Sequence, residues 1–263
     1  MSPRPVSQQH GHVDDVLQPG PQRPVVRIGD TVRRVAGWWT PAVQHLLAYL
    51  HDVGFPYAPR PLGIDDQGRE VLSYIDGDSG RATRDRVIPD SGLASYARLL
   101  RAYHEAVAGY RPPAGAEWAY GPMPFGAGDV ICHGDFGSWN LVWRGDEPVG
   151  IVDWDLAYPG PALDDVAYAL VYGVPFRSDD DAIQHFGHTE PPDRRRRIEV
   201  FAAAYGIEPG GLADAAIARQ HKYARQIRHL HDRGLAAPWT TTPSVVANEQ
   251  AARWSEANRQ LFE

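Results

Sequence analysis

One short stretch in the middle of the chain constrains the fold more than any other. Two β-prone runs, 140–144 and 149–153, flank a Gly-Asp-Glu-Pro turn, and this pattern predicts an antiparallel hairpin. If the register is symmetric about the turn, Asn140 faces Asp153, with Cα atoms roughly 5 Å apart. Asp135 precedes Asn140 on a loop that leaves a short apolar strand. The sequence therefore predicts two carboxylates and one amide oxygen at the mouth of a single hairpin.

These residue types suit one kind of chemistry. Carboxylate and amide oxygens are ligands for Mg²⁺, which takes its remaining ligands from water and substrate phosphates. A further carboxylate can orient an attacking hydroxyl and accept its proton. Taken singly, Asp135 could be a turn or cap residue, and Asp153 could be a strand-end carboxylate bonded to nearby amides. Together with Asn140 at these spacings, they favour a site for phosphoryl transfer.

The same residues resemble a known family. A His-Gly-Asp triplet from His133 to Asp135, Asn140 after it, and a Val-Asp-Trp-Asp run containing Asp153 are similar to the aminoglycoside phosphotransferases and the related choline kinases. The resemblance implies an α+β, protein-kinase-like fold of two lobes, with a small β-rich N-lobe and a larger, mostly helical C-lobe. It implies Asp135 as the catalytic base, Asn140 and Asp153 as Mg²⁺ ligands, and His133 as a structural histidine that holds the catalytic loop.

The resemblance extends to two further acidic residues. Asp165 stands where the family has an aspartate before a small apolar pair, and we expect it to accept hydrogen bonds from the catalytic-loop backbone. Asp155 follows the expected metal ligand and could be a structural hydrogen-bond acceptor or a second metal or substrate contact. The expected acceptor side could also be shaped by Trp139 or Trp154, which flank the site in the sequence.

The first lobe resembles the family more loosely. A Leu-Ser-Tyr-Ile-Asp-Gly run matches the family's hinge, which implies adenine contacts from the Ser73 carbonyl and the Ile75 amide, with Leu72 behind the base. Arg34 occupies the place of the family's nucleotide-phosphate lysine, although an exposed strand arginine is an alternative reading. An arginine can bind phosphate bidentately, but its planar fork differs from the point charge of a lysine.

Three departures from the family pattern leave a second reading open. Lys222 is the only lysine of the chain, and no Asp or Glu lies between Asp30 and Asp52 to provide the acidic partner on the first-lobe helix. The segment 18–21, which corresponds to the nucleotide loop, contains a single glycine. The competing interpretation is a kinase-like protein that binds nucleotide or another ligand with little or no turnover.

Local patterns divide the chain into three parts. Residues 1–22 are rich in Pro, Gln, His and Gly, which predicts a flexible tail. Residues 23–76 form the expected N-lobe, in which two β-prone runs around a Gly-Asp turn are followed by one helix and the hinge strand. Residues 77–263 form the expected C-lobe. Its predicted helices cover 91–107, 163–172, 195–205, 212–232 and 244–262.

Composition excludes several classes of protein. The chain of 263 residues carries 26 basic and 33 acidic residues, a net charge of −7, which argues against a general nucleic-acid binder. The basic run 194–197 is interpreted as the solvated face of a helix. A single cysteine, Cys132, excludes an intramolecular disulfide and fits a reducing compartment. No apolar run is long enough to span a bilayer, so we expect a cytoplasmic protein without membrane partners. The histidines show no zinc-site spacing.

These observations lead to one functional expectation. We expect a small-molecule kinase that transfers the γ-phosphoryl group of ATP or GTP to a hydroxyl, with Mg²⁺ as cofactor. The family resemblance implies an aminoglycoside-type antibiotic or a related amino alcohol as the acceptor. The acidic run 179–181 is compatible with such a cationic partner, although runs of this kind are usually only solvated. The expected partners are therefore a nucleotide and a small molecule.

Overall fold

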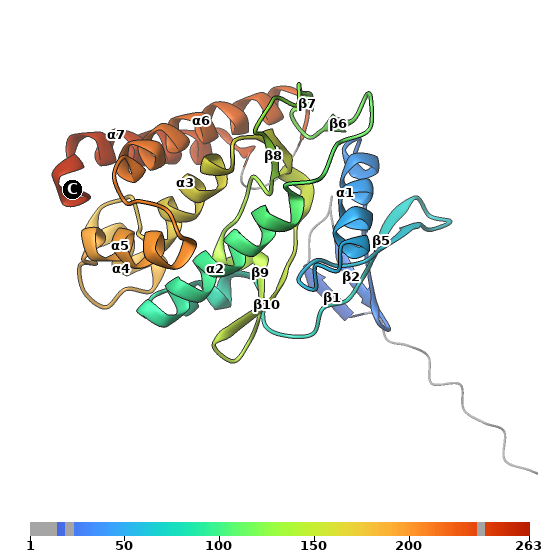
Figure 1. Cartoon of the computed structure of the whole chain (residues 1–263), viewed down its shortest axis with the longest axis horizontal. Coiled ribbons are helices and arrows are strands. Elements are labelled where there is room, and N and C mark those ends of the chain that lie inside the picture. Colours follow the sequence, from blue (N-terminus) through green and yellow to red (C-terminus); the bar gives the residue numbers. More distant parts are fainter. Residues whose placement is uncertain (1–14, 19–23, 236–239) are drawn as a thin grey trace, which may run out of the picture.

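The computed structural model describes residues 15–18, 24–235 and 240–263. Figure 1 shows an N-terminal part built on a sheet at one end of the molecule and a mostly helical part at the other. This arrangement confirms the expected kinase-like α+β fold. Of the expected tail, residues 1–14 and 19–22 lie outside the described residues, and the rest forms a strand.

The N-terminal sheet is antiparallel, with strand order β1-β2-β3-β5-β4. The predicted hairpin is present, because Ile28 pairs with Thr31 across a turn in which Gly29 has φ +61°. Such a backbone conformation favours glycine. The strands are β1 (Asp15–Gln18), β2 (Val25–Ile28), β3 (Thr31–Val35), β4 (Pro61–Ile64) and β5 (Arg69–Ser73).

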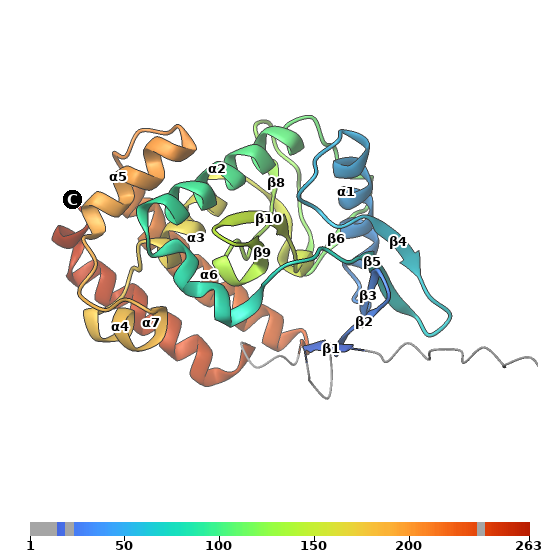
Figure 2. The same cartoon turned by 90° about the horizontal axis from the view of Figure 1, so that it is seen from below.

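One helix, α1 (Thr40–Asp52), accompanies this sheet, as the apolar spacing predicted. Its buried face includes Val43, Leu46, Leu47 and Leu50, each fully removed from solvent. Figure 2 shows the helix beside β4 and β5, with the chain then passing into the helical part. The sheet and α1 therefore share one core with the rest of the chain.

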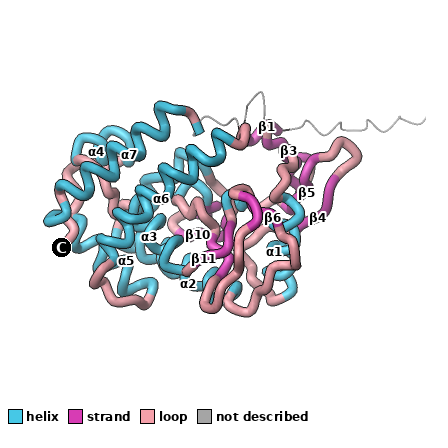
Figure 3. The backbone as a smooth tube through the Cα atoms, turned by 90° about the horizontal axis from the view of Figure 1, so that it is seen from above, coloured by secondary structure: helices cyan, strands magenta, loops and turns pink. Residues whose placement is uncertain are grey.

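The C-terminal part is dominated by helices (Figure 3), and its short strands pair as β6–β7, β8–β11 and β9–β10. Helices α2, α3, α5 and α6 match the predicted ranges to within two residues, whereas α4 was not predicted. The helices are α2 (Asp90–Val107), α3 (Ala162–Gly173), α4 (Asp179–Phe186), α5 (Arg194–Tyr205), α6 (Leu212–Asp232) and α7 (Thr242–Ala257). The short strands are β6 (Glu117–Trp118), β7 (Gly121–Pro122), β8 (Val130–Cys132), β9 (Leu141–Arg144), β10 (Glu147–Ile151) and β11 (Tyr158–Gly160).

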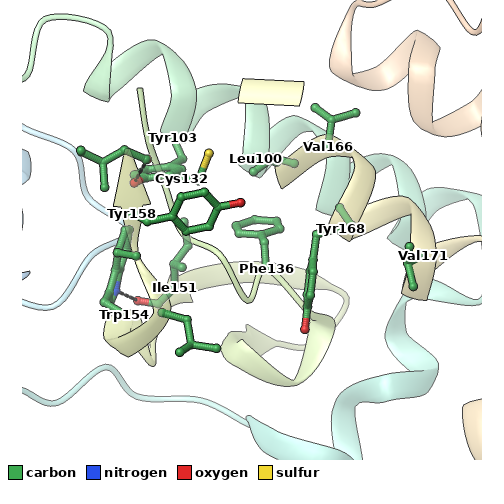
Figure 4. Close-up of a cluster of buried hydrophobic side chains, with 14 of the residues drawn as sticks. Leu100, Tyr103, Cys132, Phe136, Ile151, Trp154, Tyr158, Val166, Tyr168 and Val171 are labelled. Atoms are coloured by element: carbon green, nitrogen blue, oxygen red, sulfur yellow. Dashed lines mark hydrogen bonds between the residues drawn. The ribbon is translucent and has the colours of Figure 1, made fainter. Parts of the chain in front are cut away.

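The core lies directly beneath the segment that carries the predicted chemistry. Figure 4 shows aromatic rings from α2, α3, β11 and the loop after β8 in one cluster, with Cys132 beside Tyr103 and Tyr158. Their polar atoms are bonded, since the Trp154 indole donates to the Ile151 carbonyl at 3.0 Å and the Tyr103 hydroxyl donates to the Ile131 carbonyl at 2.6 Å. A closely packed core of this kind restricts the loops above it to one conformation. Within the described residues, no helix is both long and apolar enough to cross a membrane.

Candidate active site

The loop after β8 places Asp135 at the head of the site. Gly134 precedes it with φ +80°, and a Cβ there would meet the Leu156 carbonyl oxygen at 2.0 Å, so only glycine fits this position. The Asp135 carboxylate accepts a hydrogen bond from the Tyr168 hydroxyl of α3 and another, of 2.8 Å, from the Asn140 amide nitrogen. Both carboxylate oxygens are thereby oriented by neighbouring side chains.

Asp165, in the first turn of α3, holds the backbone of this loop. Its two carboxylate oxygens accept hydrogen bonds from the His133 amide at 2.6 Å and from the Gly134 amide at 2.9 Å. A third neighbour, His104 of α2, lies 3.3 Å from the same carboxylate. Asp165 is fully buried, and these neighbours keep its pKa below the ordinary value although burial alone would raise it. The aspartate therefore fixes the start of the catalytic loop from below.

His133 links the same loop to the strand that leads to Asp153. Its Nε2 lies 3.0 Å from the Val152 carbonyl oxygen, and its Nδ1 accepts a hydrogen bond of 3.3 Å from the Asp135 amide. Burial lowers the pKa of His133 to about 4. Both ring nitrogens are therefore used by the backbone, and the imidazole stays neutral at physiological pH.

The β9–β10 hairpin forms, but the predicted register is wrong. Ile151 pairs with Leu141 and Glu147 pairs with Arg144, with a bulge between Pro148 and Gly150. The turn contains two residues rather than the four of a symmetric Gly-Asp-Glu-Pro loop, and this shorter turn with its bulge shifts the pairing. Asn140 consequently bonds to the Val152 amide through its carbonyl, at 2.8 Å, rather than facing Asp153.

The Asp153 side chain still lies at the site, and its backbone has an uncommon left-handed conformation. Its φ of +62° makes it the single non-glycine residue with positive φ in the described part of the chain. Such a conformation is costly for most residues with a Cβ, although aspartate tolerates it better than most, and strained residues of this kind cluster at active sites. The Asp153 side chain is 50% exposed, so its carboxylate is accessible from the space in front of the loop.

Arg34 of β3 meets this carboxylate from the N-terminal sheet. Its Nη1 lies 3.4 Å from Asp153 Oδ1, and its Nη2 lies 2.9 Å from Asp155 Oδ1. Its Nε donates to Glu70 Oε2 at 2.5 Å. Burial opposes the charge on Arg34, but Asp155, Glu70 and Asp153 outweigh burial and raise its pKa. The arginine is therefore a buried, permanently charged link between the sheet and the metal-site candidate.

The acidic partner that seemed to be missing comes from a strand rather than a helix. Glu70 of β5 is directly opposite Arg34 in the β3–β5 pairing and is only 1% exposed. Helix α1 contributes Gln44 instead of an acid, and its amide donates to the other Glu70 oxygen at 2.9 Å. Glu70 was not predicted, because the acidic partner was expected on the first-lobe helix and not on the strand paired with β3.

The expected hinge residues lie at the end of β5 and just beyond it. Leu72 is buried, Ser73 pairs with Thr31, and the Ile75 amide forms no hydrogen bond with another described residue. A cavity of about 530 Å³ adjoins this segment. Its lining combines Leu17 of β1 with Ile75. The adenine contacts predicted here stay a prediction.

The electrostatics of Asp135 differ from those of an ordinary aspartate. Burial raises its pKa to about 7, and the nearby Asp153 carboxylate contributes to the rise. Hydrogen bonds from Tyr168 and Asn140, and the charge of Arg219, act in the opposite direction. A carboxylate with a pKa near neutrality can both hold and release a proton at physiological pH, which is the property needed of a general base.

Two residues that contact the Asp135 loop were not predicted from the sequence. Tyr168 lies three residues after Asp165, so both side chains project from one face of α3, and this spacing could have revealed it. Arg219 of α6 is buried, donates to the Gly134 carbonyl at 3.0 Å and lies 4.9 Å from the Tyr168 ring centroid. No local signal marked Arg219, because α6 enters the site only through tertiary packing.

The oxygen atoms of Asn140 and Asp153 suit a metal ion that takes its other ligands from water and phosphate. Among the residues that the structure describes, no group of three or more His, Cys, Asp or Glu side chains could enclose a metal ion. Asn140 uses its amide nitrogen on Asp135, at 2.8 Å to the carboxylate, which leaves its amide oxygen for another partner. One amide oxygen and the half-exposed Asp153 carboxylate match the one or two side chains with which Mg²⁺ is typically held beside phosphates.

Comparison with known proteins agrees with this geometry. Residues 116–200 match the model of the phosphotransferase enzyme family. The chain is 31% identical to the trifolitoxin immunity protein of Rhizobium leguminosarum bv. trifolii over 264 residues, which covers 94% of this chain and 96% of that protein. The chain belongs to the phosphotransferase enzyme family.

Solved structures of this family share the fold at low identity. An ethanolamine kinase of Plasmodium vivax superposes with a TM-score of 0.62 at 11% identity, covering 92% of this chain and 82% of that one. An amicoumacin kinase in complex with AMP-PNP and Ca²⁺ superposes with a TM-score of 0.61 at 12% identity, covering 95% and 89%. At such identities the similarity establishes the phosphotransferase's fold and leaves its substrates to be argued from its own residues.

Proposed function

We propose that this phosphotransferase is an ATP-dependent kinase of small-molecule alcohols, with residues 23–76 serving the nucleotide and residues 77–263 the acceptor. The observation that carries the proposal is the contact between Arg34 and Asp153, 3.4 Å apart, which joins a cation of the N-terminal sheet to the metal-site candidate. An Arg34 side chain in solvent would have favoured the alternative of ligand binding without turnover. GTP as an alternative donor stays a prediction from the sequence.

Asp135 supplies the chemistry of the transfer. The acceptor oxygen forms a bond to the γ-phosphorus while the bond between that phosphorus and the β,γ-bridging oxygen breaks, and ADP leaves. The hydroxyl proton passes to the Asp135 carboxylate, which Tyr168 and Asn140 hold in place. Mg²⁺, when bound through Asn140 and Asp153, would neutralise phosphate charge. His133 and Asp165 keep the loop in position and take no part in the proton transfer.

The test is Mg²⁺-dependent ATP consumption across a panel of aminoglycosides, macrolides, amino alcohols and hydroxy acids. Asp135→Asn is the variant of choice, because it preserves the size of the side chain and keeps one acceptor oxygen while removing the base. We expect acceptor-stimulated turnover in the unmodified protein and a loss of about 10²–10⁴-fold in the variant. Equal turnover in both proteins would remove Asp135 as the base.

The relative of known role supports a protective function for the kinase. The chain aligns over nearly its whole length with a protein named for immunity to trifolitoxin. We therefore propose that the acceptor is a growth-inhibiting compound that phosphorylation inactivates. Expression in a sensitive bacterium should raise the inhibitory concentration of the true substrate, and Asp135→Asn should abolish that protection. Protection by the inactive variant would instead indicate sequestration.

Binding without turnover is the second candidate, and one observation favours it. The Arg34 guanidinium already contacts Glu70, Asp153 and Asp155, which leaves less of it for a nucleotide phosphate. Saturable ATP binding by calorimetry, without acceptor-stimulated ADP release across the whole panel, would support this candidate over the kinase.

A further inference from the structure

A group of aromatic side chains lies on one side of the candidate base. Trp139 follows Asp135 in the catalytic loop, Tyr172 lies on α3, and Phe186 ends α4. The Trp139 and Tyr172 ring centroids are 4.7 Å apart and perpendicular, and the Tyr172 and Phe186 centroids are 6.1 Å apart and stacked. All three residues are half-buried. Three elements distant in sequence thus form one aromatic wall.

Two arginines cover this wall. The Arg84 guanidinium carbon lies 5.1 Å from the Trp139 centroid and 5.5 Å from that of Phe186. The Arg177 guanidinium carbon lies 4.0 Å from the Phe186 centroid and 5.4 Å from that of Tyr172. Such stacking orients the planar guanidinium groups and leaves their N–H edges available. Residues Trp139, Tyr172, Phe186, Arg84 and Arg177 are called the arginine–aromatic cluster below.

The positive charge of this cluster is only partly neutralised. Among the described residues, the Arg84 side chain has no hydrogen bond or ion pair, and the buried Nε atoms of Arg84 and Arg177 have no hydrogen-bond partner. Arg177 has one acidic neighbour, Asp181, at 3.1 Å. Burial lowers the pKa of Arg84, and the nearby cations Arg81 and Arg177 lower it further. Half-buried cations without matching carboxylates are unfavourable unless an anion completes the site.

The acidic run on α4 does not reverse this balance. Asp179 lies 2.8 Å from Arg194, and Asp181 is the residue already paired with Arg177. Two of the three carboxylates are therefore used by arginines of the same chain. The run that made a cationic acceptor plausible from sequence instead supports the surrounding arginines, and the remaining Asp180 is exposed.

The cluster is connected to the reacting position. The Tyr168 hydroxyl donates to Asp135, and the Tyr168 ring centroid lies 5.0 Å from that of Tyr172. Trp139 itself lies between Asp135 and Asn140 in the loop. The aromatic wall is therefore joined to the candidate base through Tyr168.

We propose that the arginine–aromatic cluster is the acceptor subsite, and that it selects an alcohol carrying an anionic group, a carboxylate, sulfate or phosphate, next to a planar ring. Arg84 and Arg177 bind the anion through their N–H edges, and the ring of the ligand packs beside them against the parts of Trp139 and Tyr172 that the arginines leave uncovered. This inference rests on the proposed kinase function and changes its acceptor class, because a polycationic aminoglycoside would be repelled by the two arginines.

The first test uses two probes of equal shape and opposite charge. 4-(Hydroxymethyl)benzoate and 4-(hydroxymethyl)benzylamine share a ring and a hydroxyl, and their binding is measured by calorimetry without nucleotide. We expect the benzoate to bind at least about tenfold more tightly than the amine, as a charged hydrogen bond implies. Tighter binding of the amine, or no measurable binding of the benzoate, would overturn the proposal.

Variants then assign the effect to the cluster. Arg84→Gln and Arg177→Gln should each weaken benzoate binding by about tenfold and leave amine binding unchanged or stronger. Arg195→Gln, on the exposed surface of α5, is the matched control and should change neither. An Arg84→Gln protein that retains its circular dichroism and its benzoate affinity would contradict the assignment.

A second measurement needs no arginine variant. Iodide and caesium quench the fluorescence of exposed tryptophans to an extent that depends on the local charge. The contribution of Trp139 is the difference between the quenching of the unmodified protein and that of the Trp139→Phe protein. Trp139 should be quenched more by iodide than by caesium, despite the net negative charge of the chain. A preference for caesium would overturn the proposal. Failure of the kinase function is separate, since it would appear as anion binding without ATP turnover.

Discussion

The buried pair of Arg34 and Glu70 provides the sharpest test of how the candidate site is supported. The side chains are 10% and 1% exposed, and their closest atoms lie 2.5 Å apart. Gln44 adds a hydrogen bond of 2.9 Å to the second Glu70 oxygen. The substitution Glu70→Ala removes the carboxylate and leaves the Arg34 Nε and the Gln44 amide without their acceptor.

The expected cost follows from these contacts. Removing one partner of a buried ion pair typically costs about 3–5 kcal/mol of unfolding free energy. Arg34 retains Asp155 at 2.9 Å and Asp153 at 3.4 Å, so its charge is not left alone. We therefore expect the lower end of that range, about 3 kcal/mol, for Glu70→Ala. Glu70→Gln can still accept a hydrogen bond and should cost about 1–2 kcal/mol.

The assay is urea unfolding followed by tryptophan fluorescence, with a double-mutant cycle through Arg34→Met. The coupling between the two positions should be about 2 kcal/mol or more. Glu105→Ala is the control, because its contact with Arg101 is short, at 2.7 Å, but the Glu105 side chain is 64% exposed. This surface pair should contribute less than about 0.5 kcal/mol. If Glu70→Ala costs no more than Glu105→Ala, or if the cycle shows no coupling, the reasoning is refuted.

Three further outcomes follow from the same structure. Tyr168→Phe removes a hydrogen bond to Asp135 and should lower kcat about tenfold while leaving the KM for ATP unchanged, which steady-state kinetics would measure. Asp153→Asn should raise the Mg²⁺ concentration needed for half-maximal turnover, and an unchanged Mg²⁺ titration would remove Asp153 as a ligand. Burial lowers the pKa of His188 to about 4 in the folded protein. The unfolded chain, in which the histidine has its ordinary pKa of about 6.5, therefore binds the proton more readily. The free energy of unfolding should consequently fall as the pH is lowered from about 6.5 towards 4. His188→Gln should show a shallower decline in thermal midpoint over that interval, and an identical slope would contradict this assignment.

Local signals in the sequence predicted much of the fold. The β2–β3 hairpin, α1, α2 and β8 follow from turn residues and apolar periodicity, which act between neighbours in the chain. The sequence likewise predicted that Asp135 and Asn140 lie together at the mouth of one hairpin, and the two side chains are hydrogen-bonded. The strand β1 inside the expected tail was missed, because its pairing with β2 is a tertiary contact and not a local preference.

Only the tertiary structure decided which charges meet. Arg34 and Asp153 are 119 positions apart, and the pairing of β3 with β5 brings Glu70 to the arginine whose acidic partner was sought on a helix. The hairpin register depended on a bulge that no residue pattern marked. Arg84 and Trp139 come from separate elements and touch because helices pack around the catalytic loop. Sequence thus determined the local elements and the residue types of the site, whereas burial and long-range packing determined their partners, because interactions between distant segments exist only once the chain has closed around a shared core.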